Sequence, residues 1–180
     1  ANAITRVFED HHENIWVSTY GGGLNRYQGE GSFIRYPSSV EQGYGFSDPM
    51  VVDIVEDDDG FLWLATEGGG VIRFDPATGK TELINHEPKN ANSLSSDKAI
   101  TLLRTQETIW VGTMNDGLNR LNRDGSFTRY SKKDGLASNG VYGLLEDDLG
   151  RIWISGGRGL SVLDVKTNEI SVYDYTHGLQ

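Results

Sequence analysis

Residues 51–75 read VVDIVEDDDGFLWLATEGGGVIRFD, and a related stretch occurs three more times in the 180 residues of the chain. Each copy contains one tryptophan, and successive tryptophans are 47, 47 and 43 residues apart. A period of about 45 residues is typical of a β-propeller blade and is longer than an ankyrin or tetratricopeptide unit. The spacing therefore predicts four copies of one structural unit, centred on Trp16, Trp63, Trp110 and Trp153.

Each copy predicts four short β-strands. The first and second strands are rich in β-branched and aromatic residues and are separated by turn residues, such as the DDDG of residues 57–60. A third strand follows the glycines, a fourth ends the copy, and no stretch has the period of a helix. The sequence thus predicts an all-β chain of four β-propeller blades, each a four-stranded antiparallel sheet. The expected blades cover residues 1–47, 48–95, 96–137 and 138–180.

The composition excludes several classes of function. The chain has 16 basic and 26 acidic side chains and a formal net charge of −10, with its Lys and Arg residues scattered. We therefore expect neither nucleic acid nor an anionic membrane surface as a partner. The absence of cysteine excludes thiolate nucleophiles and cysteine-bound zinc. The 23 glycines against 4 prolines indicate many tight turns.

Residues that recur at one phase of every copy are interpreted as scaffold. Two positions after each tryptophan stands a small side chain, as expected where an indole packs closely between neighbouring sheets. All four tryptophans are therefore predicted to be buried between blades. His86 is placed at the phase of Tyr36, Tyr130 and Tyr173 and is interpreted as a capping ring. The small residues are Ser18, Ala65, Gly112 and Ser155.

Two stretches carry a resemblance to a known family: residues 51–75, quoted above, and residues 135–155, GLASNGVYGLLEDDLGRIWIS. They resemble the two-component regulator propeller repeat, whose consensus runs roughly V-x-x-I-x-E-D-x-x-G-x-L-W-I-G-T-x-x-G-G-L-x-R-Y-D. The third copy departs from it, because residues 102–110, LLRTQETIW, have lost the Glu-Asp pair and one turn residue. The fourth copy has lost one residue of its glycine loop.

The resemblance implies a place and a role. Such repeats usually form the extracytoplasmic sensor of a membrane receptor, followed by a transmembrane helix and a histidine kinase or another output domain. It implies a periplasmic part of a bacterial inner-membrane receptor, with a membrane-anchored parent protein. Propellers of this family generally have seven blades, so we expect these four to be part of a larger ring. Bulky residues on the first strands, such as Phe8, Leu103, Tyr142 and Leu145, also favour a wider ring than four blades.

Several residue groups invite a chemical role and are better explained by structure. The spacings Asp58-x-Gly60-x-x-Trp63 and Asp148-x-Gly150-x-x-Trp153 resemble the Asp-box turn of sialidase-like propellers, which is structural. Adjacent His11 and His12 should point in different directions, so they make a poor pair of metal ligands. The triple glycines precede strands rather than helices and are interpreted as hairpin turns. We therefore expect no catalytic residue, no metal site and no cofactor.

Function is sought where the copies differ. The loops between the second and third strands share one face with the loops that join the blades, and their sequences vary, whereas the opposite face carries the repeated Asp turns. The variable loops mix Tyr, Glu, Asn, Asp and Arg, a composition suited to a neutral polar ligand such as a glycan. The candidate ligand-binding residues are Tyr20, Tyr44, Asp48, Glu67, Met114, Asn115, Asp116 and Arg158.

The sequence is thus interpreted as a non-catalytic, ligand-sensing propeller segment of a two-component receptor. The expected partners are a small polar ligand, such as an oligosaccharide, or a partner domain. We also expect the remaining blades of a propeller, or a second copy, to cover the outer sheets. Two alternatives remain: a propeller enzyme such as a lyase, and a protein-interaction platform.

Overall fold

The computed structural model describes residues 3–36 and 50–179. The candidate residues Tyr44 and Asp48 therefore lie outside the described residues. The chain divides into two compact units. The first unit runs up to Asn85 and includes Asp97–Ala99, and the second consists of His86–Ser96 and the chain from Ile100 onward. Each unit contains two sheets.

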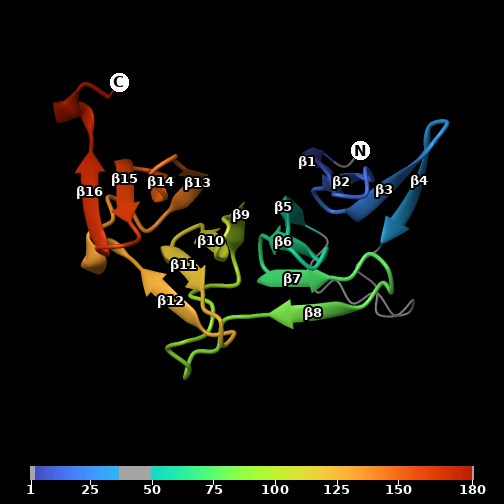
Figure 1. Cartoon of the computed structure of the whole chain (residues 1–180), viewed down its shortest axis with the longest axis horizontal. Helices are drawn as coiled ribbons and strands as arrows, with labels where there is room; N and C mark the ends of the chain where they lie inside the picture. Colours follow the sequence, from blue (N-terminus) through green and yellow to red (C-terminus); the bar gives the residue numbers. More distant parts are fainter. Residues whose placement is uncertain (1–2, 37–49, 180) are drawn as a thin grey trace. The chain divides into compact units, whose positions relative to one another are not determined.

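The described residues form four antiparallel four-stranded sheets, each with its strands in chain order (Figure 1). The first sheet contains β1 (Ile4–Glu9), β2 (Ile15–Thr19), β3 (Gly23–Gly29) and β4 (Ser32–Tyr36). The second contains β5 (Val51–Glu56), β6 (Leu62–Thr66), β7 (Val71–Phe74) and β8 (Thr81–Ile84). The third contains β9 (Ala99–Arg104), β10 (Ile109–Thr113), β11 (Leu118–Leu121) and β12 (Phe127–Tyr130). The fourth contains β13 (Val141–Glu146), β14 (Arg151–Gly156), β15 (Gly159–Asp164) and β16 (Glu169–Tyr173).

The prediction of all-β propeller blades is confirmed. Helix is limited, in the part of the chain that the structure describes, to two short 3-10 turns, η2 (Lys132–Asp134) and η3 (Tyr175–His177). In each turn the side chain of the third residue accepts a hydrogen bond from the backbone N–H of the residue that precedes the turn. Asp134 accepts the N–H of Ser131, and His177 accepts that of Asp174. The two turns are equivalent features of the third and fourth repeats.

In the first unit the core lies between the two sheets. Trp16 and Tyr36 of the first sheet pack against Phe74 of the second, with ring centroids 5.8 and 5.1 Å from that of Phe74. Leu64 and Ile72 of the second sheet are fully buried in the same cluster. Edge-to-face contacts of this kind stabilise beyond the area that they bury.

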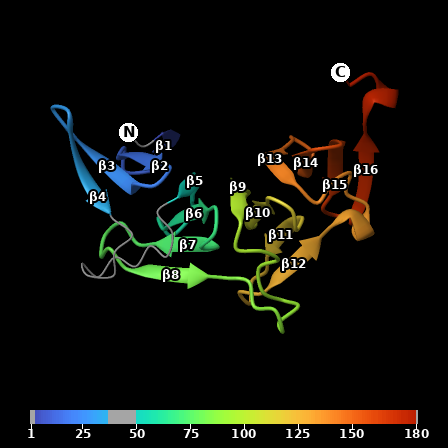
Figure 2. The same ribbon diagram turned by 180° about the vertical axis from the view of Figure 1, so that it is seen from behind.

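In the second unit the third and fourth sheets pack in the same way; Figure 2 shows these sheets from behind. Trp110 is buried in a cluster with Tyr130 of its own sheet and with Ile152 and Ile154 of β14. Gly112 lies where a Cβ atom would come within 2.5 Å of Thr101 Cγ2 and 2.6 Å of Val141 Cγ1. The small residue after the tryptophan is therefore required by the close approach of β13.

One part of the tryptophan prediction is wrong. Trp16, Trp63 and Trp110 are buried, but Trp153 is only partly buried and stacks on Tyr173 at a centroid distance of 6.2 Å. Trp16 and Trp110 owe their burial to the sheet that follows them in the same unit. The fourth sheet has no following sheet among the described residues, so the indole of Trp153 stays in partial contact with solvent.

The glycine that opens each third strand is fixed by two constraints. Gly23, Gly70, Gly117 and Gly159 all have positive φ, between 70° and 126°. A Cβ atom on any of them would collide with the carbonyl oxygen that ends the fourth strand, at 2.8 Å for Gly23 and Tyr36. The prediction that the glycine runs are hairpin turns is confirmed.

The assignment of His86 is wrong. The strand register places Ile84 opposite Val71, at the phase where Tyr36 faces Leu24 and Tyr130 faces Leu118. His86 lies beyond β8, where its Nδ1 is 2.8 Å from the carbonyl oxygen of Leu94.

The segment before β9 is anchored to the third sheet by one side chain. The guanidinium of Arg129 donates to the carbonyl oxygens of Asn90, Ser93 and Leu94 over 2.9–3.0 Å. Its Nη2 also donates to the hydroxyl of Ser93 over 3.0 Å. Arg129 of β12 thus fixes the path of the connection between β8 and β9 by binding the backbone carbonyl groups of that connection.

Candidate functional site

The face that carries the variable loops and the candidate ligand-binding residues is called the rim below. In the first unit the candidates Tyr20 and Glu67 meet at Met50. Tyr20 forms an isolated β-bridge with Met50, and the backbone N–H of Glu67 donates to the carbonyl oxygen of Met50 over 3.2 Å. Tyr20 is 45% exposed. The structure therefore brings these two candidates together at the start of β5, as the loop argument predicts.

In the second unit the loops after β10 and β14 meet around Gly140, which precedes β13. A Cβ atom on Gly140 would lie 2.9 Å from the carbonyl oxygen of Met114, and one on Gly156 would lie 2.8 Å from the carbonyl oxygen of Gly140. Asn115, Asp116 and Arg158 on these loops are exposed. The candidates of this unit thus share one surface.

Sequence reasoning missed an aromatic residue on that surface. Tyr142 is 56% exposed, and a Cβ atom on Gly157, next to Arg158, would lie 3.7 Å from its ring. From the sequence it was interpreted only as a bulky first-strand residue that favours a wider ring. The missing signal was the pair Gly156 and Gly157, the last residue of β14 and the one after it, which leaves the space beside the ring open.

At the opposite end of the strands, an aspartate in the turn between the first and second strands holds the tryptophan. Asp10 accepts the indole N–H of Trp16 over 2.8 Å, Asp57 that of Trp63 over 2.9 Å, and Asp147 that of Trp153 over 2.8 Å. The turn interpretation is confirmed. The aspartate that binds the indole is, however, the residue before each of the two positions, 58 and 148, that define the Asp-box spacing.

Hydrogen bonds lower the pKa of two of these carboxyl groups, those of Asp10 and Asp147. Burial raises the pKa of Asp10, but hydrogen bonds from Trp16, from Asn14 and from backbone N–H groups outweigh it, so the pKa is lowered overall. The indole N–H of Trp153 holds the pKa of Asp147 well below its usual value, and the backbone and side chain of Arg151 act in the same direction. Hydrogen bonds to the charged form have this effect on any carboxyl group.

In two of the turns the same carboxylate also binds an arginine that lies over the indole. Asp57 Oδ2 is 3.2 Å from Arg73 Nε, and Asp147 Oδ2 is 2.7 Å from Arg151 Nη2. The carboxylate therefore bridges an indole N–H and a guanidinium.

The third turn has no such carboxylate. The backbone N–H of Thr105 donates to the carbonyl oxygen of Thr108, two residues before Trp110, over 2.9 Å. The aspartates of the other turns make the same bond, to the residue two before their own tryptophan. Thr105 therefore takes the place of the aspartate, and its hydroxyl is used within the turn, where it accepts the backbone N–H of Thr108.

The two adjacent histidines do not diverge as predicted. Their rings lie 3.7 Å apart between centroids. His11 is held by Glu56 of β5, with its Nδ1 2.5 Å from Oε1 and its backbone N–H 2.9 Å from Oε2. The described residues contain no group of three or more His, Cys, Asp or Glu side chains placed to hold a metal ion. None of their helices is long and apolar enough to cross a membrane.

A family model matches two stretches of the chain. Residues 45–68 and 135–158 both match the family described as two component regulator propeller. These two stretches are thus similar to two component regulator propeller repeats. The resemblance drawn from the sequence alone is thereby confirmed in the second and fourth copies, which match the consensus most fully. No curated protein sequence is matched by the chain.

Solved structures similar to these repeats are propellers. The extracellular domain of a hybrid two-component system from B. thetaiotaomicron has a TM-score of 0.85 and 21% identity, covering 96% of this chain and 24% of that one. The extracellular domain of a one-component system from the same organism has a TM-score of 0.83 and 19% identity, covering 99% and 26%. Virginiamycin B lyase from Staphylococcus aureus has a TM-score of 0.71 and 14% identity, covering 96% and 55%.

At these identities the likeness establishes the propeller fold. The chain spans about a quarter of the length of the extracellular domains that it matches.

Proposed function

We propose that these repeats form part of an extracytoplasmic, non-catalytic sensor of a membrane-anchored two-component receptor and that their variable loops bind a small neutral polar ligand. The observation that carries this proposal is the match of two copies to two component regulator propeller repeats. The likeness in fold to extracellular domains of such systems supports it. The signal would be a change in the arrangement of blades or subunits.

The surface around Gly140 is the best-formed part of the proposed binding face. Tyr142 offers an exposed ring on which a sugar could stack. Asn115 and Asp116 on one loop, and Arg158 on the other, offer exposed donors and acceptors. An oligosaccharide needs this combination of a flat ring and several hydrogen-bonding groups.

Calorimetric titration of the chain with a panel of neutral oligosaccharides tests the proposal. Tyr142→Ala and Arg158→Ala should each weaken binding by about tenfold, and Tyr20→Ala tests the first unit in the same way. Arg123→Ala is the matched control, because Arg123 is equally exposed in the turn between β11 and β12, at the other end of the strands. Binding that survives the rim substitutions and is lost in the control would show that the face is wrong.

The rival function is enzymatic, as in a lyase built on a propeller. A lyase needs an acid and a base that converge on one substrate. An assay of glycan and lactone turnover, with and without divalent metal ions, separates the two functions. Turnover that is lost on substitution of a rim residue would replace the sensor proposal.

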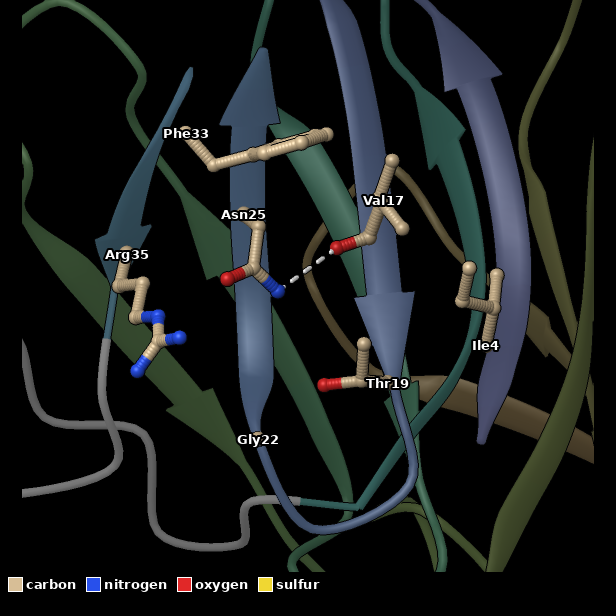
Figure 3. Close-up of a pocket in the computed structure, with 7 residues that line it drawn as sticks. All are labelled: Ile4, Val17, Thr19, Gly22, Asn25, Phe33 and Arg35. Carbon is tan, nitrogen blue, oxygen red and sulfur yellow. Dashed lines mark hydrogen bonds between the residues drawn. The ribbon is translucent and has the colours of Figure 1, made fainter. Parts of the chain in front are cut away.

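The outer face of the first sheet supports a further partner, another propeller sheet. Val17 and Asn25 stand at the phases of Leu64 and Ile72, which in the second sheet are buried against Trp16. In the first sheet they instead line an open hollow of about 480 Å³ together with Phe33, Arg35 and Ile4 (Figure 3). We propose that a neighbouring blade, or a second copy of this chain, covers this face.

A further inference from the structure

A cavity of about 460 Å³ lies in the second unit at the third turn, between the third and fourth sheets. Its lining includes Trp110 and Arg120 from the third sheet and Asp148 from the turn of the fourth. It lies at the opposite end of β10 from the loop that starts at Met114. It is therefore separate from the proposed ligand-binding rim.

Trp110 contributes its buried indole to the wall of this cavity. Trp110 is 1% exposed, and its Nε1 has no acceptor among the described residues, since Thr105 stands where the other turns have an aspartate. No fully buried side-chain nitrogen or oxygen of the described residues lacks a partner. Because Nε1 of Trp110 has no partner, it must belong to the small part of the indole that stays accessible. Trp110 lines the cavity, so we place this free donor on the cavity wall.

The guanidinium of Arg120 lies beside the same indole and also lines the cavity. Its Cζ is 5.6 Å from the ring centroid of Trp110. The arginines at the same phase of the other third strands lie at similar distances, 6.0 Å for Arg73 and Trp63 and 5.8 Å for Arg26 and Trp16. In the fourth sheet Arg151, from the second strand, lies 5.7 Å from the ring of Trp153.

In the second and fourth turns a carboxylate joins the guanidinium and the indole N–H. The third turn keeps both donors, but its carboxylate, that of Glu107, accepts from Arg120 and not from the indole N–H.

We propose that this cavity binds the carboxylate of a small acidic molecule, which accepts the indole N–H of Trp110 and pairs with the guanidinium of Arg120. A charged guanidinium and an indole N–H on the wall of one cavity favour a carboxylate over a hydroxyl as the bound group. The chain itself supplies the template, because Asp57 and Asp147 occupy the equivalent point in their own turns.

The acidic residues around the cavity do not exclude an anion. Glu107, Glu146 and Asp148 line it together with Arg120 and Lys166. Glu107 Oε2 is 3.5 Å from Arg120 Nη2, and its side chain is 75% exposed. In the second turn Asp57 is held although Asp59 and Glu82 lie within 4.0 Å of the same Arg73 guanidinium. The third turn therefore resembles a site that already holds a carboxylate.

The test follows the four indole N–H signals of the nitrogen-15-labelled chain by NMR while acetate is added at constant ionic strength. Acetamide, which has the same shape without the charge, is the control ligand. The signal of Trp110, assigned from the loss of one peak in Trp110→Phe, should shift and saturate with acetate, and the other three should not. Without acetate this N–H should exchange with solvent fastest of the four.

Three variants separate the proposal from its rivals. Thr105→Asp supplies the missing carboxylate and should abolish the shift. Arg120→Gln should weaken acetate binding roughly tenfold. If Thr105→Asp does not fold, this variant alone tests whether acetate binds beside Trp110. Glu107→Gln should leave binding equal or tighter.

Four results would overturn the proposal. Three concern the titration: no acetate-induced shift, an equal shift of all four signals, or a shift that persists in Thr105→Asp. The fourth concerns the protein without acetate: slow exchange of the Trp110 N–H that becomes fast in Glu107→Gln. The last result would identify Glu107 as an internal partner. None of these results bears on the rim, whose ligand is neutral.

Discussion

Asp147 and Trp153 are joined across the turn between β13 and β14 by a hydrogen bond of 2.8 Å from the indole Nε1 to Oδ2. The same carboxylate accepts the backbone N–H groups of Leu149 and Arg151, each over 3.0 Å. One ionised side chain thus fixes the turn and the tryptophan of its blade. Stability should therefore depend on the ionisation of this group.

We expect Asp147→Asn to lower the Tm by a few degrees at neutral pH and by progressively less in acid. The pKa of Asp147 is lower in the folded chain than in the unfolded one. Its stabilising effect is therefore complete above the unfolded pKa of about 4 and is lost as the pH falls from there towards the folded pKa. Thermal melts of both chains between pH 7 and about pH 2 measure the difference. Asp148→Asn is the control, and a Tm difference independent of pH would contradict the assignment.

Replacement of the glycine before a third strand should lower the free energy of unfolding more than replacement of a glycine between the third and fourth strands with a similar backbone conformation. Gly117 and Gly125 have φ of 89° and 83°, but only at Gly117 would a Cβ atom meet the carbonyl oxygen of Tyr130. Gly125→Ala should cost about 1–2 kcal/mol of unfolding free energy from the left-handed backbone alone. Gly117→Ala should cost clearly more in urea unfolding. Equal costs would mean that the carbonyl moves aside freely.

The small residue after the tryptophan should be essential only where the next sheet approaches it. Gly112→Ala adds a methyl group within 2.6 Å of Thr101 and Val141 and should cost about 1–3 kcal/mol. Ser155→Thr adds a methyl group at the same phase of the fourth sheet, where Ser155 is exposed, and should change stability by at most about 0.5 kcal/mol. Chemical denaturation measures both, and a tolerant Gly112 would contradict the packing argument.

The isolated chain should self-associate or be marginally stable. Phe33 is 49% exposed and Val7 59% exposed in the first sheet, and exposed apolar faces of this kind rarely persist on monomers. Sedimentation equilibrium should reveal association that Phe33→Ser weakens. Leu83→Ser, at a residue 45% exposed in the second sheet, should not weaken it. A monodisperse monomer with a sharp, reversible melt at high temperature would contradict this expectation.

Repetition made most of the fold predictable, because four copies give four readings of each position. The four-stranded sheet predicted for each copy is present in all four copies. What repetition could not give is the influence of a neighbour. Trp153 has the same phase as Trp16, yet no sheet follows it among the described residues, and it is only partly buried. His86 was misplaced because it was aligned with the rings that end the other fourth strands, whereas the pairing of Ile84 with Val71 puts Ile84 at that phase.

The sites were less predictable than the scaffold. The rim is a proposal from variation between loops, and the exposure of Tyr142 depends on how Gly157 leaves space beside its ring. The donors at the third turn had a clear signal in the sequence, the loss of Glu-Asp before Trp110. Its meaning depends on knowing that the aspartate accepts an indole N–H, and that bond is visible only in the structure.

The anchorage of residues 90–94 by Arg129 has an evolutionary consequence. The guanidinium binds three carbonyl oxygens and a single side-chain hydroxyl, that of Ser93. Carbonyl groups are present whatever the side chain, so most positions of this segment can mutate without loss of the contacts that set its path. The connection can therefore diversify its outward-facing chemistry while it keeps its shape, and Arg129 is the position that natural variation should spare.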